Sequence, residues 1–506
     1  MRDPDSVDVS DDLPPWRDWI DRARDAVDRV RRNLDADLAL QASMAGLIEL
    51  AATRYAVDPG AQWRPGEPLK LLFAGYTGTR NTGADVRVQE MIRQVRHLLG
   101  EAHSELYVTT IDPARSQGYY RGVVQLELPQ IYPKFVLDTV HEVHGVVACE
   151  GSMFKSKFAN ALSTYMVGAL GCAGAENKLA IGWGGEAGHM DESLEALVSR
   201  YCADALVMCR NEESQRLLRG LGVPAKAGTD TAWTYDPGPL EPGREHLRAL
   251  GWDGHTPVVV LCPVNPFWWP VKPDVGRGLL HAVTGAYAAE HYKSVYFHHA
   301  GPEVEAQLGD YLDRWAAGVR AVQRQRSIFP VVVGMEALDR VACEGLAERL
   351  GGAPVVVSDE HAMVPMVRLI RCASALISSR YHAIVCTMAA RVPSAGITMD
   401  ERIRNLMADR GTPELALEVG DPDLAPKVER TLGRLLSEGD AVADGIGRCV
   451  VENLVRMGQM GQTFIEYLRE RHPAFPIRPE LGAHGDPWDH LPRLPRVVED
   501  LVVDFT

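Results

Sequence analysis

Short apolar runs alternate with amphipathic stretches through most of the chain. Runs such as LKLLFAG, GVVACEG, PVVVLCPVN and SALISSR alternate with segments that have apolar residues at helical spacing, which lie between several of these runs. Fully apolar runs of this length are typical of strands that are buried on both faces. Strands that alternate with helices form parallel sheets, so the pattern predicts an α/β protein with helices on both faces of each sheet.

Stretches rich in proline and glycine divide this pattern into regions. DPGAQWRPGEP separates a helical extension, residues 1–66, from the first strand, and TYDPGPLEPGREH separates two alternating regions. We predict an N-terminal α/β domain at residues 67–235 and a C-terminal α/β domain at residues 240–420, both doubly wound and facing each other across a cleft. Residues 445–506 combine a helical pattern with a Pro-rich tail that we expect to be irregular.

Composition indicates a globular protein that does not bind polyanions. The 506 residues include 53 Lys+Arg and 68 Asp+Glu, and the net charge of −15 disfavours nucleic acids and anionic membranes. The nine cysteines form no CxxC pair and lie mostly in apolar runs, which predicts buried free thiols in a reducing compartment. The acidic N-terminus does not resemble a secretory signal, and no stretch reaches the roughly 20 apolar residues that span a bilayer. We therefore expect a cytoplasmic protein without an integral membrane segment.

Polar residues follow several predicted strands, at the sheet edge where open parallel sheets bind their ligands. The loop GYTGTRNTGAD opens a helix and carries Asn81 and Asp85, and VVACEGSMF ends a strand at Glu150 and Gly151. A helix N-terminus attracts anions, and a carboxylate can accept sugar hydroxyls or act as a base. A glycine turn and a solvated glutamate, neither with a role in binding, would explain the same residues. The loop is neither a P-loop nor a GxGxxG, so nucleotide binding does not follow from it.

Two further strand ends carry arginine. Arg210 follows ALVMC and could grip an anion, although an ion pair with a glutamate in the next helical turn explains it better when taken alone. LISSRYHAIV places Ser378, Ser379 and Arg380 where they can bind an anion, with His382 two residues further on. Histidine titrates near neutral pH, and its position at a strand end beside an arginine favours a functional role over a structural one.

Aromatic and histidine pairs follow two strands of the second region. Trp268 and Trp269 could stack on a sugar ring, although packing between the domains explains them slightly better. His298 and His299 point to opposite faces because they are adjacent, so they make a poor metal pair. No other spacing suggests a metal site.

Four segments taken together resemble the polysaccharide pyruvyl transferase family. They occur in the family's order as AGYTGTRNTGAD, VVACEGSMF, CRNEESQRLLRGLGV and ISSRYHAIVCTMAARVPSAGITMDERIRNLM. The third is similar to the family's R-[DN]-E-x-S…L…LG element. The last and most specific is similar to its S-x-R-x-H-A…A…G-V-P element. The resemblance covers about residues 69–410, but RNTGAD replaces the common GNTGDE, and Glu150-Gly151-Ser152 replaces a glycine triplet.

The resemblance implies a GT-B-like fold and the transfer of a pyruvyl group from phosphoenolpyruvate onto two hydroxyls of one sugar, in a polysaccharide or its precursor. It implies no cofactor, because phosphoenolpyruvate is a co-substrate. On this interpretation His382 is the general acid or base, Arg380 and Arg210 hold the carboxylate and the phosphate, and the two serines complete the anion site. The residues expected to face the sugar acceptor or bind substrate are Asn81, Asp85, Glu150, Gly151, Trp268 and Trp269.

Two other functions fit the same residues. A nucleotide-sugar-dependent glycosyltransferase of the same fold would hold a diphosphate in the C-terminal domain, use Glu150 or His382 as base, and place Asp400 or Glu401 near the ribose. A catalytically silent member would bind a sugar or an anion without turnover, which the altered glycine motifs favour. The helical extension is expected to serve packing or self-association into a homo-oligomer.

Overall fold

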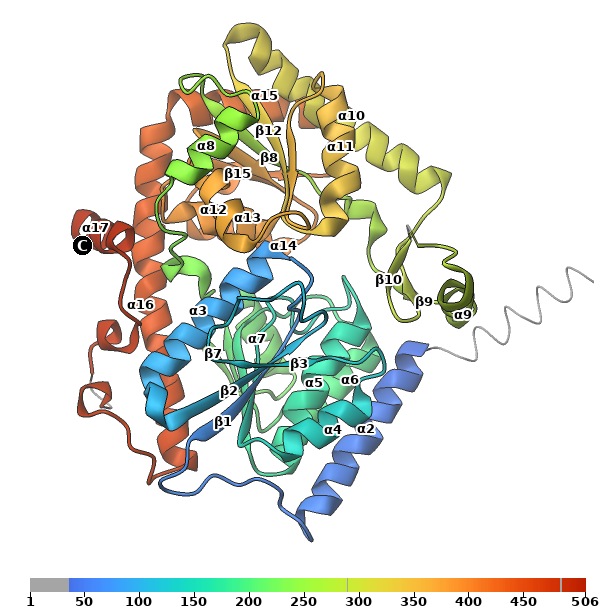
Figure 1. The fold of residues 1–506 in the computed structure, drawn as a ribbon, viewed down its shortest axis with the longest axis vertical. Coiled ribbons are helices and arrows are strands. Elements are labelled where there is room, and N and C mark those ends of the chain that lie inside the picture. The colour runs from blue at the N-terminus through green and yellow to red at the C-terminus, as the bar shows by residue number, and fades with distance from the viewer. Residues whose placement is uncertain (1–35, 289, 483–484) are drawn as a thin grey trace, which may run out of the picture.

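Two α/β domains and a long helix that packs on both of them make up the protein (Figure 1). The computed structural model describes residues 36–288, 290–482 and 485–506. The two sheets confirm the predicted GT-B-like class, since each is parallel throughout and covered by helices on both faces. The first 35 residues of the predicted helical extension lie outside the described residues.

Seven parallel strands form the N-terminal sheet, in the order β3-β2-β1-β4-β5-β6-β7. The central strands are almost wholly buried, which explains why they read as continuous apolar runs. The chain continues to opposite sides of β1, toward β2 on one side and β4 on the other, so the carboxyl ends of β1 and β4 mark the point where a ligand is expected. The bounds are β1 Leu69–Ala74, β2 Ser104–Thr110, β3 Val124–Glu127, β4 Gly145–Ala148, β5 Leu179–Gly185, β6 Leu206–Cys209 and β7 Ala225–Ala227.

Helices connect these strands. The N-cap asparagines at the starts of α3 and α7 each accept a hydrogen bond from a backbone N–H in the first turn, so the helices begin directly after the strand-end loops. The bounds are α3 Thr82–Leu99, α4 Pro133–His141, α5 Asn160–Ala175, α6 Glu192–Tyr201 and α7 Glu212–Gly220, with short 3₁₀ turns η1 Glu101–His103 and η2 Ala232–Thr234.

Helix α2, Ala36–Tyr55, is the described part of the predicted extension, and it belongs to the N-terminal domain. It lies beside α4, α5 and α6 (Figure 1). Met44 and Ile48 of α2 fill the space over Gly168 and Gly171 of α5, where any larger side chain would collide with them. The helix is therefore an outer layer of this domain.

Six parallel strands form the C-terminal sheet, in the order β13-β12-β8-β14-β15-β16. Strand β14 lies next to the central strand β8 and leads directly into α13, which begins at the predicted Arg380–His382 motif. The strands are β8 Val258–Cys262, β12 Phe329–Gly334, β13 Val355–Val357, β14 Ala375–Ser378, β15 Ser394–Thr398 and β16 Ala416–Glu418. The helices are α8 Glu241–Ala249, α10 Pro302–Gln325, α11 Arg340–Arg349, α12 Met363–Arg371, α13 Tyr381–Met388, α14 Glu401–Asp409 and α15 Leu424–Ser437. The 3₁₀ turns are η3 Pro266–Trp268, η4 Ala337–Asp339 and η5 Pro413–Leu415.

An insertion follows β8 and corrects one expectation. We predicted that SVYFHHAG forms a strand of the main sheet, but its Tyr296–Phe297 is strand β11 of a separate small antiparallel sheet in the order β10-β11-β9. The other elements are β9 Lys272–Pro273, α9 Val275–Thr284 and β10 His291–Lys293. The insertion reaches across to the N-terminal domain, where Tyr296 packs with Ala159 (Figure 1).

The C-terminal region begins with α16, Gly439–Arg471, which runs along one side of both domains (Figure 1). The predicted helix is therefore present and longer than expected. The Pro-rich tail is not wholly irregular, because it ends in α17, Arg496–Phe505, after 3₁₀ turns η6 Pro479–Leu481 and η7 Pro487–His490.

The nine cysteines are all free thiols, and eight of them are buried, as predicted. Among the helices of the described residues, none combines the length and the apolar character that crossing a membrane requires.

Candidate functional site

A small cavity of about 50 Å³ lies between the two domains, at the carboxyl ends of their central strands. It brings together six of the predicted site residues, three of them on the acceptor side of the N-terminal domain. Its other walls are formed by residues that the sequence did not single out. The predicted residues that line it are Asn81, Glu150, Gly151, Arg210, Arg380 and His382, and the others are Gly83, Ala84, Met335, Tyr381 and Arg402.

His382 forms an ion-pair contact across the domain boundary. Its Nε2 lies 3.2 Å from Oδ2 of Asp230, which is fully buried in the loop after β7. Burial by itself would raise the pKa of Asp230, but His382, Arg87 and Arg210 together hold that pKa well below its usual range. Asp230 is therefore a carboxylate that fixes the orientation of the imidazole, as in other carboxylate–histidine pairs. The ring's Nδ1 forms no hydrogen bond with any described residue and remains available to exchange a proton.

Gly83 allows the two domains to meet at His382. It lies in the first turn of α3, and a Cβ placed on it would overlap Cβ and Nδ1 of His382. Asn81 caps the same helix by accepting a hydrogen bond from the backbone N–H of Ala84. The glycine-asparagine loop thus places the N-terminus of α3 close to the imidazole of His382.

Arg210 lines the cavity but is already paired. Its guanidinium donates to Glu186 and lies 3.4 Å from Oδ2 of Asp230, and it stacks 4.3 Å from the ring centre of Tyr381. Burial opposes its charge, but Glu186 and the neighbouring groups raise its pKa above the usual range. An ion-paired arginine was the simpler of our two expectations for this residue. The partner is Glu186, however, and not a glutamate of the following helix.

Arg380 is held in the same way on the opposite side. Its Nε donates to Asp339 at 2.9 Å, and its Nη2 lies 3.2 Å from Glu336. Glu336 in turn accepts hydrogen bonds from the Tyr76 hydroxyl at 2.8 Å and from the Asn81 amide at 3.0 Å, both in the N-terminal domain. Burial raises the pKa of Glu336, and Arg380 opposes that rise. Both arginines of the predicted anion site therefore already have carboxylate partners, and their role in holding a donor stays a prediction.

Two more cations, Arg402 of the C-terminal domain and Lys155 of the N-terminal domain, are also paired with carboxylates. Arg402 donates to Asp400 at 2.7 Å and lies 4.5 Å from the ring centre of Phe158. The buried amine of Lys155 contacts Glu186 at 3.0 Å and Glu401 at 2.6 Å, which links the two domains. Asp400 and Glu401, which a nucleotide-sugar enzyme would use on a ribose, are thus occupied by protein cations.

Three predicted residues lie close to the cavity without lining it. Asp85 is buried in α3 and accepts a hydrogen bond from Tyr120 at 2.8 Å, so it does not face an acceptor. Ser378 exchanges hydrogen bonds with the backbone of Arg380, and Ser379 pairs with the Tyr311 hydroxyl at 2.9 Å. Both serines hold the strand-to-helix turn in place, so the expectation that they complete an anion site is corrected.

Trp268 and Trp269 also lie outside the cavity. Trp268 packs on His298 at a ring distance of 4.8 Å, and Trp269 packs edge-on against Phe158 of the N-terminal domain at 5.2 Å. Trp269 therefore packs between the domains, which was the simpler of our two expectations for this residue. Within the part of the chain that the structure describes, no cluster of His, Cys, Asp or Glu could hold a metal ion.

Sequence reasoning missed the carboxylates that organise the site. Asp230 lies in the irregular stretch GTDTAWT, Glu186 follows β5, and Glu336 follows β12. Each of the three directly follows a strand, or a strand-end loop, on the same edge as the arginines. That position was a usable signal, because buried arginines at a strand end require acidic partners nearby.

Comparison with known proteins shows only distant structural likeness. No family model and no curated protein matches the chain. The UDP-GlcNAc 2-epimerase of Methanocaldococcus jannaschii is 10% identical, with 73% of this chain and 93% of that chain covered at a TM-score of 0.48. The enzyme of that name from Neisseria meningitidis, bound to UDP-GlcNAc, is 11% identical over 86% of this chain and 100% of that chain, at a TM-score of 0.42. A mutant O-GlcNAc transferase of Thermobaculum terrenum is 13% identical over 87% and 78% of the two chains, at 0.41.

Proposed function

We propose that the protein is a transferase that moves a pyruvyl group from phosphoenolpyruvate onto two hydroxyls of a sugar, with His382 as the proton-transfer group. The observation that carries the proposal is the His382–Asp230 pair, whose imidazole lines one cavity with Arg210, Arg380 and Glu150. An imidazole with a buried carboxylate partner and a free Nδ1 is suited to general acid–base work. The choice of phosphoenolpyruvate as donor follows from the four sequence segments that resemble the pyruvyl transferase family.

The size of the cavity supports a small donor. Its volume of about 50 Å³ is far below the roughly 300–1,000 Å³ of typical cofactor and ligand pockets. A nucleotide sugar would need the domains to separate widely, whereas phosphoenolpyruvate needs a smaller opening. The arginines would then exchange part of their contact with Glu186 and Asp339 for the phosphate and carboxylate of the donor.

The reaction needs three proton transfers that these residues are placed to make. The first sugar hydroxyl loses its proton as it adds to C2 of the donor, and C3 gains a proton. The second hydroxyl then loses its proton as it displaces phosphate from C2, which closes the ketal. His382 can supply or accept a proton through Nδ1, and Glu150 on the other side of the cavity can take the proton of the attacking hydroxyl. The guanidinium groups offset the charge that develops on the departing phosphate.

A second candidate is a nucleotide-sugar-dependent enzyme of the same fold. Glu150 and His382, either of which it would use as a base, both line the cavity. We rank it second because Asp400 and Glu401 are engaged by Arg402 and Lys155. A ligand-binding protein without turnover is the third interpretation.

One assay separates the three functions. Phosphate release from phosphoenolpyruvate is measured with a panel of UDP- and GDP-sugars and lipid-linked sugars as acceptors, for the native protein and for His382→Gln. We expect the substitution to lower turnover by about 10²–10⁴-fold without changing the thermal midpoint. His299→Gln, outside the cavity, is the matched control. Release of nucleotide without phosphoenolpyruvate would support the second candidate, and binding without either product would support the third.

A further inference from the structure

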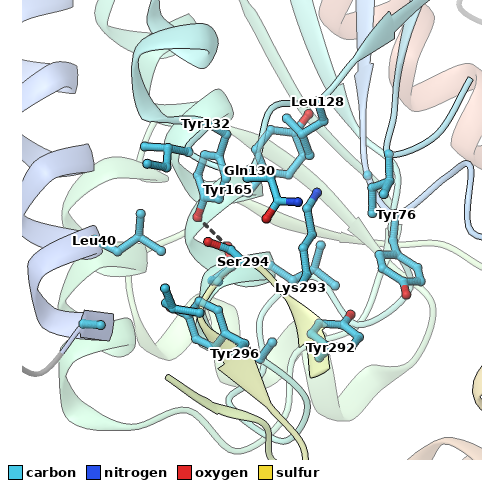
Figure 2. Close-up of a pocket in the computed structure, with 18 residues that line it drawn as sticks. Leu40, Tyr76, Leu128, Gln130, Tyr132, Tyr165, Tyr292, Lys293, Ser294 and Tyr296 are labelled. Atoms are coloured by element: carbon cyan, nitrogen blue, oxygen red, sulfur yellow. Dashed lines mark hydrogen bonds between the residues drawn. The ribbon is translucent and has the colours of Figure 1, made fainter. Parts of the chain in front are cut away.

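A second cavity lies beside the candidate site and differs from it in character. It has a volume of about 250 Å³ and lies between the insertion of the C-terminal domain and helices α2 and α5 of the N-terminal domain (Figure 2). Its lining is mainly apolar and aromatic and includes Leu40, Leu128, Tyr132 and Tyr165. Apolar cavities of about 150 Å³ are able to hold a molecule the size of benzene, so this one has room for a longer apolar body.

The walls of this cavity are fixed by hydrogen bonds. The Tyr132 hydroxyl donates to the carbonyl of Ala161 at 2.6 Å, and the Tyr296 hydroxyl donates to Asp37 of α2 at 2.6 Å. These contacts tie the insertion and the N-terminal domain to the same rim. The cavity is therefore bounded by ordered elements on both sides.

Lys293 places a single positive charge in this apolar lining. It lies in β10, and its side chain extends between the labelled tyrosines in the direction of Gln130 (Figure 2). No described residue forms an ion pair or hydrogen bond with its amine. Burial lowers the pKa of Lys293 to about 8, so the amine remains protonated at neutral pH. Lys293 is half-buried, so its charge in this apolar lining without a counterion is costly, and an anionic ligand group would offset that cost.

We propose that this cavity binds an amphiphile with an apolar chain and one anionic head, whose head group pairs with Lys293. The chain replaces water along the leucine and tyrosine walls, and the head supplies the missing counterion. The inference does not depend on pyruvyl transfer, since none of its residues takes part in the proton transfers at His382.

The test compares two ligands of the same chain length, one with an anionic head and one with a neutral head. Binding of decanoate and of decanol is measured by isothermal titration calorimetry at pH 7, below the concentration at which either aggregates. We expect decanoate to bind about tenfold or more tightly than decanol, because a charge-assisted hydrogen bond contributes about 1.5–3 kcal/mol. Equal affinities, or no binding of decanoate, would overturn the proposal.

Variants assign the charge effect to one amine. Lys293→Met should bind both ligands with similar affinity, and Lys293→Arg should keep the preference for decanoate. Lys272→Met is the matched control, because Lys272 lies in the same small sheet but does not line the cavity. Loss of the preference in the Lys272 variant, or its persistence in Lys293→Met, would contradict the assignment. Leu162→Trp, which fills the cavity, should abolish binding of both ligands even if Lys293→Met does not fold.

Discussion

At the scale of single residues, a glycine of the N-terminal domain packs tightly against a histidine of the C-terminal domain. Gly83 leaves no room for a methyl group beside His382. We predict that Gly83→Ala displaces the imidazole and lowers turnover by about 10²-fold, since a misplacement of about 1 Å has that effect. The overlap should also lower the free energy of unfolding by about 1–3 kcal/mol.

Gly46→Ala is the control for that substitution. Gly46 lies in the middle of α2 with nothing within 4 Å of an added Cβ, so alanine should raise the free energy of unfolding by about 0.5–1 kcal/mol and leave turnover unchanged. Urea denaturation and the phosphate-release assay measure both quantities. Native turnover in Gly83→Ala would show that the position of His382 is unimportant.

A second residue-scale prediction concerns pH. Burial raises the pKa of Asp85 to about 7, against the opposing hydrogen bond from Tyr120. Between about pH 4 and pH 7 the folded protein therefore holds a proton that the unfolded chain has lost. The free energy of unfolding should fall with rising pH by about 1.4 kcal/mol per pH unit in that window, and level off above pH 7.

Asp85→Asn removes this titration, so the difference between the variant and the native protein isolates the contribution of Asp85 from those of all other groups. The stability of the variant relative to the native protein should therefore increase from pH 5 to pH 7 and stay constant from pH 7 to pH 8. Urea denaturation of both proteins at each pH gives the difference. Parallel pH profiles would show that Asp85 is ionised in the folded state.

The residues that could be predicted from the sequence are those attached to a motif. Three of them follow buried strands and match a family sequence pattern, so their location in one cavity was foreseeable: Arg210, Arg380 and His382. The contacts of Asp230 and Glu336 were not, because an ion pair or hydrogen bond between two domains leaves no periodic trace in either segment. The same limit explains why an ion pair of Arg210 was expected with a glutamate of the next helix and not with Glu186.

At the scale of elements, helix α16 holds both domains together. Its Phe464 is fully buried and packs on Trp183 of β5 at a ring distance of 5.3 Å, and its Asn453 accepts a hydrogen bond from Thr229. We predict that Phe464→Ala lowers the free energy of unfolding by about 3–5 kcal/mol, measured by urea denaturation. Glu466→Ala, on the exposed face of the same helix, should change it by less than about 0.5 kcal/mol. Similar losses in the two variants would mean that the packing of α16 is not specific.

Long buried strands were predictable and short edge strands were not. Strands β1, β5 and β8 are five to seven residues of nearly uniform apolar character. Strand β7 has three residues, two of them exposed, so no apolar run marks it. The prediction that Tyr296–Phe297 belongs to the main sheet was wrong for two reasons. This apolar pair follows a helix, as a strand of the main sheet would. Its packing against the other domain is not visible in a local sequence pattern.

At the scale of the whole molecule, several contacts cross between the domains at once. The Tyr76–Glu336 hydrogen bond, the Lys155–Glu401 ion pair and the His382–Asp230 pair all join residues of different domains. Helix α16 adds an apolar interface to both. We predict a single cooperative transition in differential scanning calorimetry, with equal calorimetric and van't Hoff enthalpies. Two resolved transitions would show that the domains unfold independently.

The path of the chain also has a consequence for its synthesis. The surface of the first sheet around Trp183 is covered by Phe464, nearly 300 residues later in the sequence. While the chain is still on the ribosome, the N-terminal domain has all its strands but not its last covering helix. That apolar face therefore stays exposed until α16 has been translated. Chaperones that recognise exposed apolar surface can bind the nascent protein there.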